Sequence, residues 1–375
     1  MKKYKIFNVA FLVDGSFLPI RNGANYSIFN LMNALKDSSI VDPSLIISYR
    51  GWDDPSLFYD QKFNTILLSP ADYYNDTGIL EYVASIRGVQ FVHIYNSEEV
   101  LNMGLRLQRS GVKIIYEVIN IDHILYGQLS TDKKKLQSIL EMQKKACLVA
   151  DYIMCRSHID RQYLLKMGIA EEKIATYKGA IDPFSIDFSL RKKPRNKIIF
   201  LGHMYYPPNE EALKLIVSKI IPKLKKIKDD YEVTIIGNTP KSTINKYRNV
   251  QGLIFGGGQD DLSGLLKKFD IGIAPLYHGS GTRLKLLDYL ASGLPIITTN
   301  VGAEGLDKKI NDYFFIEDDI NLYPDLINKI MSNLESTNAK SLLGRKFVEN
   351  NYSWQKAVSS FTGVYKKIVN NRYNG

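Results

Sequence analysis

A glycine-rich turn followed by a charged helix is the stretch of this sequence best suited to chemistry. Residues 277–306 read YHGSGTRLKLLDYLASGLPIITTNVGAEGL, a pattern that predicts a turn, a helix ended by SGLP, a short strand and a second glycine turn. Gly279 and Gly281 form the first turn, and Thr282 is a candidate N-cap for a helix that begins near Arg283. Backbone N–H groups have no intrahelical partner at such a helix start, so this turn is a candidate anion site.

The first turns of this helix carry two cations where helix stability alone would favour acids. A helix N-terminus bears a partial positive charge, so Arg283 and Lys285 are slightly unfavourable there. A diphosphate would reverse that balance, because it can accept hydrogen bonds from the free N–H groups and from both side chains. Asp288 follows Lys285 by one turn, where a carboxylate can accept hydrogen bonds from ribose hydroxyls. The alternative for Lys285 and Asp288 is an ordinary surface ion pair.

Glycine also ends the other strands expected in the second half of the chain. One such glycine needs only to form a tight turn, but the set predicts exposed backbone N–H groups facing one cleft; its members are Gly202, Gly237, Gly256 to Gly258, Gly302 and Gly305. In the first half, Gly23 precedes a helix that Asn22 or Asn25 could cap, which predicts a second, looser phosphate cradle.

Signatures of other nucleotide-binding and hydrolytic proteins are missing from the sequence. The dinucleotide fingerprint GxGxxG does not follow the first expected strand, which disfavours a Rossmann oxidoreductase. We find no Walker pattern and no Ser–His–Asp arrangement. The paired aspartates at 53–54, 229–230, 260–261 and 318–319 fit turns or helix ends better than a metal-binding loop. We therefore expect no cofactor and no metal.

Short apolar strands alternate with amphipathic helices in both halves of the chain, which predicts parallel sheets covered on both faces. The expected strands of the first half are 5–13, 44–48, 65–69, 89–95, 112–120 and 151–157, with helices at 26–36, 78–87, 99–110 and 132–149. A second series has strands at 197–202, 231–237, 250–257, 270–276, 294–299 and 313–317. Between them lies DPFSIDFSLRKKPRN, a proline-containing linker at 182–196. The fold class is therefore α/β, with two doubly wound domains whose ligand binds in the cleft between them.

The composition indicates in which cellular compartment the protein works. The 375 residues are 45% hydrophobic, enough for two cores, and the two cysteines have neither metal-like nor disulfide spacing, so a cytoplasmic protein is expected. The start MKKYKIFNVAFLVDG lacks a cleavage site and fits a first buried strand better than a signal peptide.

A net charge of +10 suits an anionic partner. The lysine-rich segment 132–145 is most simply a solvated helix face. An anionic membrane surface is the alternative partner there, met by an apolar edge of Leu136, Ile139, Leu140 and Met142.

The stretch GSGTRLKLLDYLASGLPIITTNVGAEGL resembles the sugar-nucleotide signature of the family-four (group 1) retaining glycosyltransferases of the GT-B fold, most closely its glycine-rich variant. Other segments are similar to the family over nearly the whole chain, among them RNGANYSIFNLMNAL, IYEVINID, FLGHMYYPPNEEAL and NYSWQKAVSSFTGVYKKIV. The resemblance implies two Rossmann-like domains, an acceptor-side domain at 1–181 and a nucleotide-sugar domain at 197–354. A final helix at 355–375 would cross back to the first domain.

The resemblance implies a donor site for a nucleoside-diphosphate sugar. In that site Asp288 would bind the ribose, Arg283 and Lys285 the diphosphate, and Phe255 and Gly256 would flank the base. The remaining expected donor residues are Gly23, Gly202, His203, Ser280, Gly281 and Thr282. Arg283 and Lys285 are also expected to be catalytic, because they would stabilise the departing diphosphate.

The sequence departs from the family pattern at three positions and offers three candidate residues for the acceptor side. Ser280 stands where the family has its first glutamate, Ile119 where it often has a histidine, and His203 where it often has an arginine. His93 (expected to be catalytic as well), Asn120 and Asp122 stand at ends of first-half strands and are candidates to meet the acceptor.

The expected activity is metal-independent transfer of a sugar to an acceptor hydroxyl with retention, in glycan or cell-envelope polysaccharide synthesis. The acceptor would be a glycan, a lipid-linked molecule or a protein, with no nucleic acid involved and attachment to the inner membrane face as a further option. The alternatives are a catalytically weak GT-B subunit that binds or chaperones an acceptor, and a sugar-nucleotide epimerase.

Overall fold

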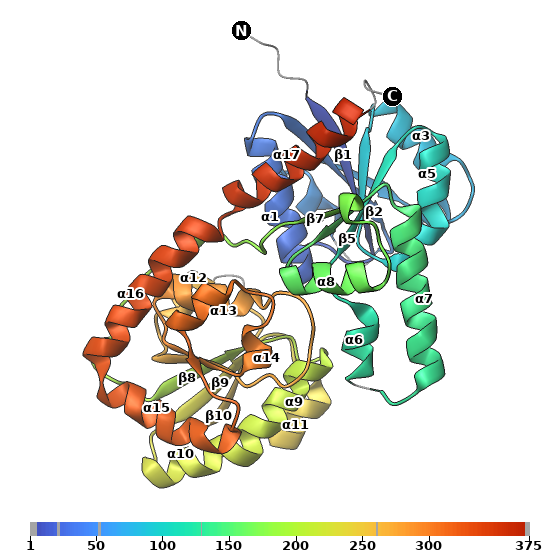
Figure 1. Cartoon of the computed structure of the whole chain (residues 1–375). Helices are drawn as coiled ribbons and strands as arrows, with labels where there is room; N and C mark the ends of the chain where they lie inside the picture. Colours follow the sequence, from blue (N-terminus) through green and yellow to red (C-terminus); the bar gives the residue numbers. More distant parts are fainter. Residues whose placement is uncertain (1–5, 21–22, 52–53, 129, 260–261, 372–375) are drawn as a thin grey trace. The chain divides into compact units, whose positions relative to one another are not determined.

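The computed structural model describes residues 6–20, 23–51, 54–128, 130–259 and 262–371. It divides into two compact units, one formed by Met1–Gly179 with Trp354–Gly375 and the other by Ala180–Ser353 (Figure 1). The two Asp-Asp pairs at 53–54 and 260–261, and the candidate cap Asn22, lie wholly or partly outside the described residues.

The first unit is built on a parallel sheet which, in the described part of the chain, has seven strands in the order β3-β2-β1-β4-β5-β6-β7. Its strands are β1 Phe7–Asp14, β2 Val41–Ser48, β3 Asn64–Leu68, β4 Phe91–Ile94, β5 Lys113–Val118, β6 Tyr152–Cys155 and β7 Ile174–Thr176. Its helices are α1 Gly23–Asp37, α2 Pro70–Tyr74, α3 Ile79–Ile86, α4 Ser97–Glu99, α5 Leu105–Arg109, α6 Asp122–Gly127, α7 Lys133–Val149, α8 His158–Lys166 and α17 Trp354–Asn371, with a π-helical stretch Val100–Gly104 between α4 and α5.

Both faces of this sheet are covered, which explains the near-continuous apolar strands. On β1, Ala10 and Leu12 join the core beneath α3, α5 and α7. On β4, Phe91 faces the other way and stacks on Tyr365 of α17 with ring centroids 4.8 Å apart. Every second residue therefore meets a different helix layer.

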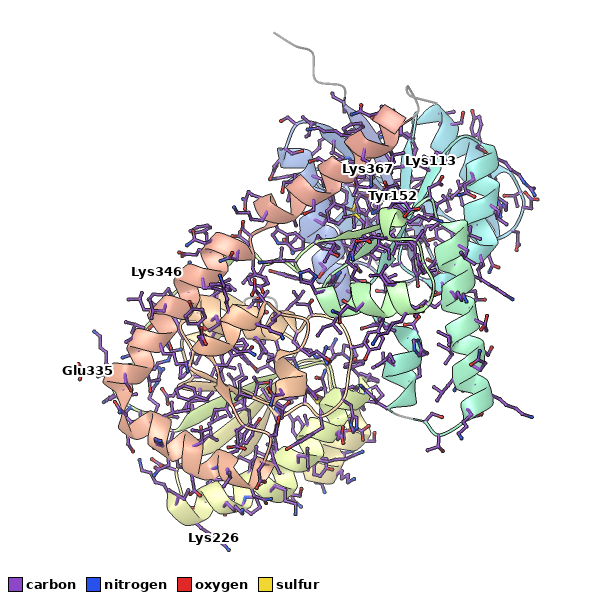
Figure 2. All side chains as sticks on the ribbon, viewed as in Figure 1. Lys113, Tyr152, Lys226, Glu335, Lys346 and Lys367 are labelled. Atoms are coloured by element: carbon purple, nitrogen blue, oxygen red, sulfur yellow. The ribbon has the colours of Figure 1, made fainter. Side chains whose placement is uncertain are left out.

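The C-terminal helix α17 packs on the first unit, to which its residues belong. It lies against α1, and its Phe361 and Tyr365 are fully buried. The Lys367 ammonium lies over the Tyr152 ring of β6, 5.3 Å from the ring centroid (Figure 2). Burial of each large side chain contributes about 2 kcal/mol, so α17 is an integral part of this unit.

The second unit has a parallel sheet that, over the residues described, contains six strands in the order β10-β9-β8-β11-β12-β13. Its strands are β8 Lys197–Leu201, β9 Glu232–Ile236, β10 Leu253–Gly257, β11 Ile271–Ala274, β12 Ile296–Thr298 and β13 Phe315–Ile316. Its helices are α9 Pro207–Leu215, α10 Ile221–Ile227, α11 Lys241–Tyr247, α12 Leu262–Leu266, α13 Leu284–Ser292, α14 Asn300–Ala303, α15 Tyr323–Ser332 and α16 Leu334–Asn351, with a π-helical stretch Ile216–Ile220 between α9 and α10.

The segment 182–196, expected as a linker, packs within the second unit. Ile186 is buried there, and its carbonyl accepts a hydrogen bond of 3.0 Å from the Arg345 guanidinium of α16. Near the end of the segment, the backbone N–H of Arg195 donates to the Asp270 carboxylate at 2.7 Å. These contacts tie the segment to the body that follows it in the sequence.

Candidate functional site

The candidate site lies at the point in the second sheet where the strand order reverses. β8 stands between β9 and β11, so the loops that leave β8 and β11 diverge toward opposite faces. Ligands of open parallel sheets bind at such a point, beyond the carboxyl ends of the strands. Gly202 and His203 follow β8 directly, and residues 279–283 belong to the loop that follows β11. The topology therefore brings two expected loops to one edge of the sheet.

Helix α13 begins one residue later than expected and without a side-chain cap. Its first helical residue is Leu284, and Arg283 occupies the N-cap position with φ −86° and ψ 84°. The prediction that Thr282 caps this helix is wrong. The Thr282 hydroxyl donates to the carbonyl of Gly305 at 3.3 Å instead, because the second glycine turn passes close to the first. The N–H groups of the first turn of α13 thus receive no cap from the N-cap side chain.

Arg283 is buried and shapes its own loop. Its guanidinium donates to the carbonyl of Ser280 at 2.5 Å and also to the carbonyl of Gly281. These bonds hold the loop in a tight turn in which Gly281 has a φ of +75°. A side chain at Gly305, itself at φ +84°, would place its Cβ 2.8 Å from the Gly281 carbonyl oxygen. The close approach of the two turns therefore requires glycine at position 305.

Lys285 of α13 is held in place by residues of β8 and of α9, the helix that follows β8. Its ammonium donates to Oδ1 of Asn209 on α9 at 2.9 Å and lies over the Phe200 ring of β8, 4.3 Å from the ring centroid. Burial, with a smaller effect from the Arg283 charge, lowers the pKa of Lys285 to about 7. An anion bound at this point would favour the charged ammonium.

Asn209 was not singled out by the sequence, yet it connects the two loops. Its amide nitrogen donates to the carbonyl of His203 at 3.0 Å while its oxygen accepts from Lys285. A Cβ on Gly202 would lie 2.8 Å from the Asn209 amide carbon, so the amide occupies the space that a side chain would need. An asparagine two residues beyond Pro207 carries no signal of such a role in the sequence.

Asp288 lies one turn after Lys285 but does not pair with it. It is buried, and burial raises the pKa of its carboxyl to about 7. Within the described part of the chain no ion pair joins Asp288 to a base, so the surface-pair alternative is wrong. A buried carboxyl without a charged partner is expensive in a purely structural role, and a ligand that donates hydrogen bonds would stabilise its ionised form.

The residues expected near the base lie on β10, and His203 lies in the loop that follows β8. Phe255 and Gly256 lie on β10 at a shift in its register with β9, and the carbonyl of Gly256 accepts from Gln259 at 2.7 Å. Burial lowers the pKa of His203, whose Nδ1 accepts from the N–H of Tyr205 at 3.3 Å. His203 is therefore a neutral imidazole at neutral pH rather than a substitute for a cationic arginine.

A histidine in the loop that the sequence singled out pairs with a glutamate of α9. Nδ1 of His278 lies 2.5 Å from Oε2 of Glu211 on α9. Together with the contact of Lys285 and Asn209, it links α9 to α13 and to the loop before α13. Reading the sequence missed it because the partners are separated by 67 residues.

In the first unit, Gly23 begins α1 as expected for a loop leading into a helix. Nothing lies within 4 Å of a Cβ built on Gly23, so packing does not require glycine there. Asn25 does not cap from outside the helix; it lies within α1, and its amide donates to the carbonyl of Ser16 at 2.9 Å.

The assignment of His93 to the acceptor side is wrong. The residue lies within β4, is fully buried, and faces α17. Its Nδ1 lies 2.7 Å from the Glu117 carboxylate, and its Nε2 lies 2.8 Å from the Tyr365 hydroxyl. With both ring nitrogens occupied inside the protein, His93 has a structural role and is removed from the catalytic residues.

Asn120 and Asp122 do lie close together, joined by Gln143 of α7. The Gln143 amide donates to the carbonyl of Asn120 at 2.9 Å and accepts from the N–H of Asp122 at 3.0 Å. Burial raises the pKa of Asp122 to about 6. The next residue, His123, has a buried Nδ1 without a hydrogen-bond partner. Polar groups thus gather at the carboxyl end of β5, where a ligand of this sheet would lie.

The described residues contain neither a cluster of metal ligands nor a membrane-spanning helix. In that part of the chain no three His, Cys, Asp or Glu side chains gather as a metal site would require. None of the helices described there has the length and apolar character needed to cross a bilayer.

Comparison with known proteins finds a family match within the second unit. Residues 195–333 match the family described as "Glycosyl transferases group 1". An uncharacterised 44.6 kDa protein in the cps region of Klebsiella pneumoniae is 26% identical over 44% of this chain and 44% of its own length. The uncharacterised glycosyltransferase MJ1069 of Methanocaldococcus jannaschii is 23% identical over 59% of each chain. The chain therefore aligns with only about half the length of these relatives.

Solved structures agree with the fold over nearly the whole chain. The sucrose-phosphate synthase of Thermosynechococcus elongatus has a TM-score of 0.78 at 13% identity, with 97% of this chain and 100% of that chain covered. Alr3699/HepE of Anabaena in complex with UDP-glucose has a TM-score of 0.72 at 11% identity, covering 95% and 99%. The expected fold, two parallel-sheet α/β domains of the GT-B type, is confirmed.

Proposed function

We propose that this protein is a glycosyltransferase that moves a sugar from a nucleoside-diphosphate sugar to an acceptor hydroxyl. The observation that carries the proposal is the arrangement of Lys285 and Asp288 one turn apart on α13, both with a pKa displaced to about 7, at the reversal of strand order. The group 1 match over 195–333 and the likeness to a protein bound to UDP-glucose support the same reading.

The diphosphate binds where α13 begins. Lys285 takes up a proton as the anion arrives, and its ammonium then faces both the phosphate oxygens and Asn209. Arg283 keeps the loop closed through its bonds to Ser280 and Gly281, so the N–H groups stay directed at the ligand. Because these groups are in place before reaction, they stabilise the charge that develops on the leaving diphosphate.

The nucleoside half binds through Asp288 and β10. An ionised Asp288 accepts hydrogen bonds from the ribose hydroxyls, which replace the water that burial has removed. Phe255 and Gly256 flank the base, with the partly buried ring of Phe255 offering an apolar surface. Neutral His203 contributes a hydrogen-bonding group and no charge.

The acceptor side is proposed at the carboxyl end of β5, where Asn120, Asp122 and Gln143 meet. A glycan, a lipid-linked molecule or a protein would present its hydroxyl there. Independence of metal ions is part of the proposal because Lys285 and the helix N-terminus would neutralise the diphosphate, and cytoplasmic location is part of it because the two cysteines lack disulfide spacing. Retention of the anomeric configuration is a further part and rests on the family resemblance. Involvement in cell-envelope polysaccharide synthesis has the same basis.

The test is incubation of the full chain with UDP-, GDP- and dTDP-sugars and a panel of sugar acceptors, with nucleotide release as the readout. Transfer that persists in EDTA and yields the donor's anomeric configuration by NMR supports the proposal. Nucleotide binding with no release from any donor would favour the acceptor-binding subunit, and conversion of the donor sugar without release would favour the epimerase.

Two variants locate the donor site. Lys285→Ala and Asp288→Ala should each weaken nucleotide binding at least tenfold, since each removes a charged hydrogen-bond partner worth about 1.5–3 kcal/mol. Lys226→Ala on α10 and Glu335→Ala on α16 are matched controls, because both side chains are exposed on the same unit (Figure 2). Unchanged affinity in both site variants would place the nucleotide elsewhere.

A further inference from the structure

The order of groups in a nucleoside-diphosphate sugar determines on which side of α13 the sugar lies. The donor is a linear molecule in which the diphosphate stands between the ribose and the sugar. With the ribose at Asp288 and the diphosphate at Lys285 and the start of α13, the donor runs along the helix toward its first residue. The sugar then lies beyond the helix start, beside the loop formed by residues 278–283.

A histidine and a glutamate that the proposed mechanism does not use lie at this loop. Nδ1 of His278 is 2.5 Å from Oε2 of Glu211, which belongs to α9. The next residue of the loop, Gly279, is close to Arg283 and to the start of α9, because a Cβ built on it would lie 2.7 Å from Nη2 of Arg283 and 3.4 Å from the Tyr206 hydroxyl. The pair therefore adjoins the turn that leads into the diphosphate site.

Both side chains keep hydrogen-bonding groups available for a ligand. The side chains of His278 and Glu211 are 35% and 38% exposed. Among the residues that the structure describes, neither Oε1 of Glu211 nor Nε2 of His278 has a partner, and neither atom is buried. The contact with Oε2 places a proton on Nδ1, so Nε2 of a neutral ring accepts. Two acceptors side by side suit the neighbouring hydroxyls of a sugar, each of which can donate one hydrogen bond.

The charge of Glu211 is not neutralised by a lysine or arginine in the described part of the chain. Lys214, which follows Glu211 by one turn, pairs instead with Glu210 at 2.9 Å. Arg283 donates to two carbonyls of its own loop. A ligand that brought a carboxylate of its own to Glu211 would therefore meet a like charge, whereas an uncharged hydroxyl would not.

We propose that Glu211 and His278 bind hydroxyls of the sugar carried by the donor, and that Glu211 selects an uncharged sugar over a uronic acid. The inference rests on the proposed function, because the position of the sugar follows from that of the diphosphate. It adds two residues to the donor site and names the class of sugar. The alternative is that the pair only ties α9 to the loop, in which case its loss would affect nucleotides and nucleotide sugars alike.

The experiment is isothermal titration of the full chain with UDP, UDP-glucose and UDP-glucuronate. The two sugars differ only at C6, where glucose has a hydroxymethyl group and glucuronate a carboxylate. We expect UDP-glucose to bind at least about tenfold more tightly at 50 mM salt, and the ratio to shrink at 500 mM salt, where charges are screened. The corresponding compounds of GDP and dTDP are used if one of those nucleotides binds more tightly than UDP.

The unaltered chain separates this inference from the proposed function. Absence of binding to UDP, GDP and dTDP alike would contradict the proposed function and, with it, the donor site. Nucleotide binding with equal affinity for the neutral and the acidic sugar overturns only the selection by Glu211.

Variants assign the selection to the pair. Glu211→Gln keeps the shape of the side chain and removes its charge, so it should lower the preference for UDP-glucose at least about fivefold and change the affinity for UDP less than twofold. Glu210→Gln is the matched control, because it makes the same change at the next residue of α9, whose carboxylate pairs with Lys214. His278→Ala should weaken UDP-glucose binding several-fold more than UDP binding, and His278→Asn, which retains a hydrogen-bonding group, should lose less.

Two results contradict the assignment to the sugar. One is a Glu211→Gln variant whose preference between the two sugars equals that of the unaltered chain. The other is a variant of either residue that weakens UDP, UDP-glucose and UDP-glucuronate by the same factor, which would make the pair a structural tie between α9 and the loop.

Discussion

Replacement of Lys285 by methionine should stabilise the unliganded protein while it weakens nucleotide binding. The lysine pKa falls from 10.5 to about 7 on folding, chiefly because the ammonium is buried beside Phe200. A depression of this size corresponds to about 4 kcal/mol of unfavourable free energy at pH 7 and below. Methionine keeps an unbranched apolar stem of similar length and removes that cost.

The gain is smaller than the pKa alone indicates. Oδ1 of Asn209 loses its donor, which costs about 1–3 kcal/mol if no water replaces Lys285. The contact of the ammonium with Phe200 is also lost, at about 1 kcal/mol. The net expectation is a stabilisation of about 1 kcal/mol, or about 2–4 °C in melting temperature for a unit of this size.

The pH dependence separates this cause from ordinary repacking. Between pH 7 and 10.5 the unfolded lysine binds more protons than the folded one, so the stability of the unaltered protein rises with pH across that window. The variant lacks this rise. Its advantage should therefore be full below pH 7 and shrink toward pH 10, whereas a packing effect would be the same at both values.

The assays are calorimetric melting of the full chain at pH 6.5 and 9.5 and isothermal titration with UDP, GDP and dTDP. Nucleotide affinity should fall about 10- to 100-fold, as expected for a lost charged hydrogen bond. Lys226→Met is the control for charge removal at an exposed site. A variant that is less stable at pH 6.5 than the unaltered protein, with nucleotide affinity intact, would refute the reasoning.

Three further changes test other parts of the structure. Nucleotide affinity of the unaltered protein relative to Asp288→Asn should fall as pH drops below 7, because Asp288 with a pKa of about 7 then becomes protonated, whereas protonation of Lys285 affects both proteins alike; titration calorimetry of the two proteins measures this ratio. Gly202→Ala should displace Asn209 and weaken nucleotide binding several-fold without unfolding the protein, and normal affinity would contradict the close approach of 2.8 Å. Tyr365→Phe should lower stability in urea by about 1–2 kcal/mol, because His93 loses a buried partner; no change would contradict that hydrogen bond.

The sequence alone was sufficient for the fold, and it singled out the turn and helix at 277–306 as a candidate anion site. Strand and helix periodicities are local properties, so the alternation of apolar runs with amphipathic helices predicted two parallel sheets. The order of the glycine turn, helix and strand at 277–306 likewise predicted an anion site from neighbouring residues. The signature also carried the resemblance to glycosyltransferases, and the group 1 match over 195–333 agrees with it.

Only the tertiary structure decided which side chains are available and in what charge state. His93 lies on a strand both in the sequence prediction and in the structure. Its burial, however, depends on α17, whose Tyr365 lies 272 residues away in the sequence. Lys285 and Asn209 are separated by 76 residues, and their contact sets both the geometry and the environment of the ammonium. Burial and pKa follow from elements that meet after folding, and a local pattern does not encode them.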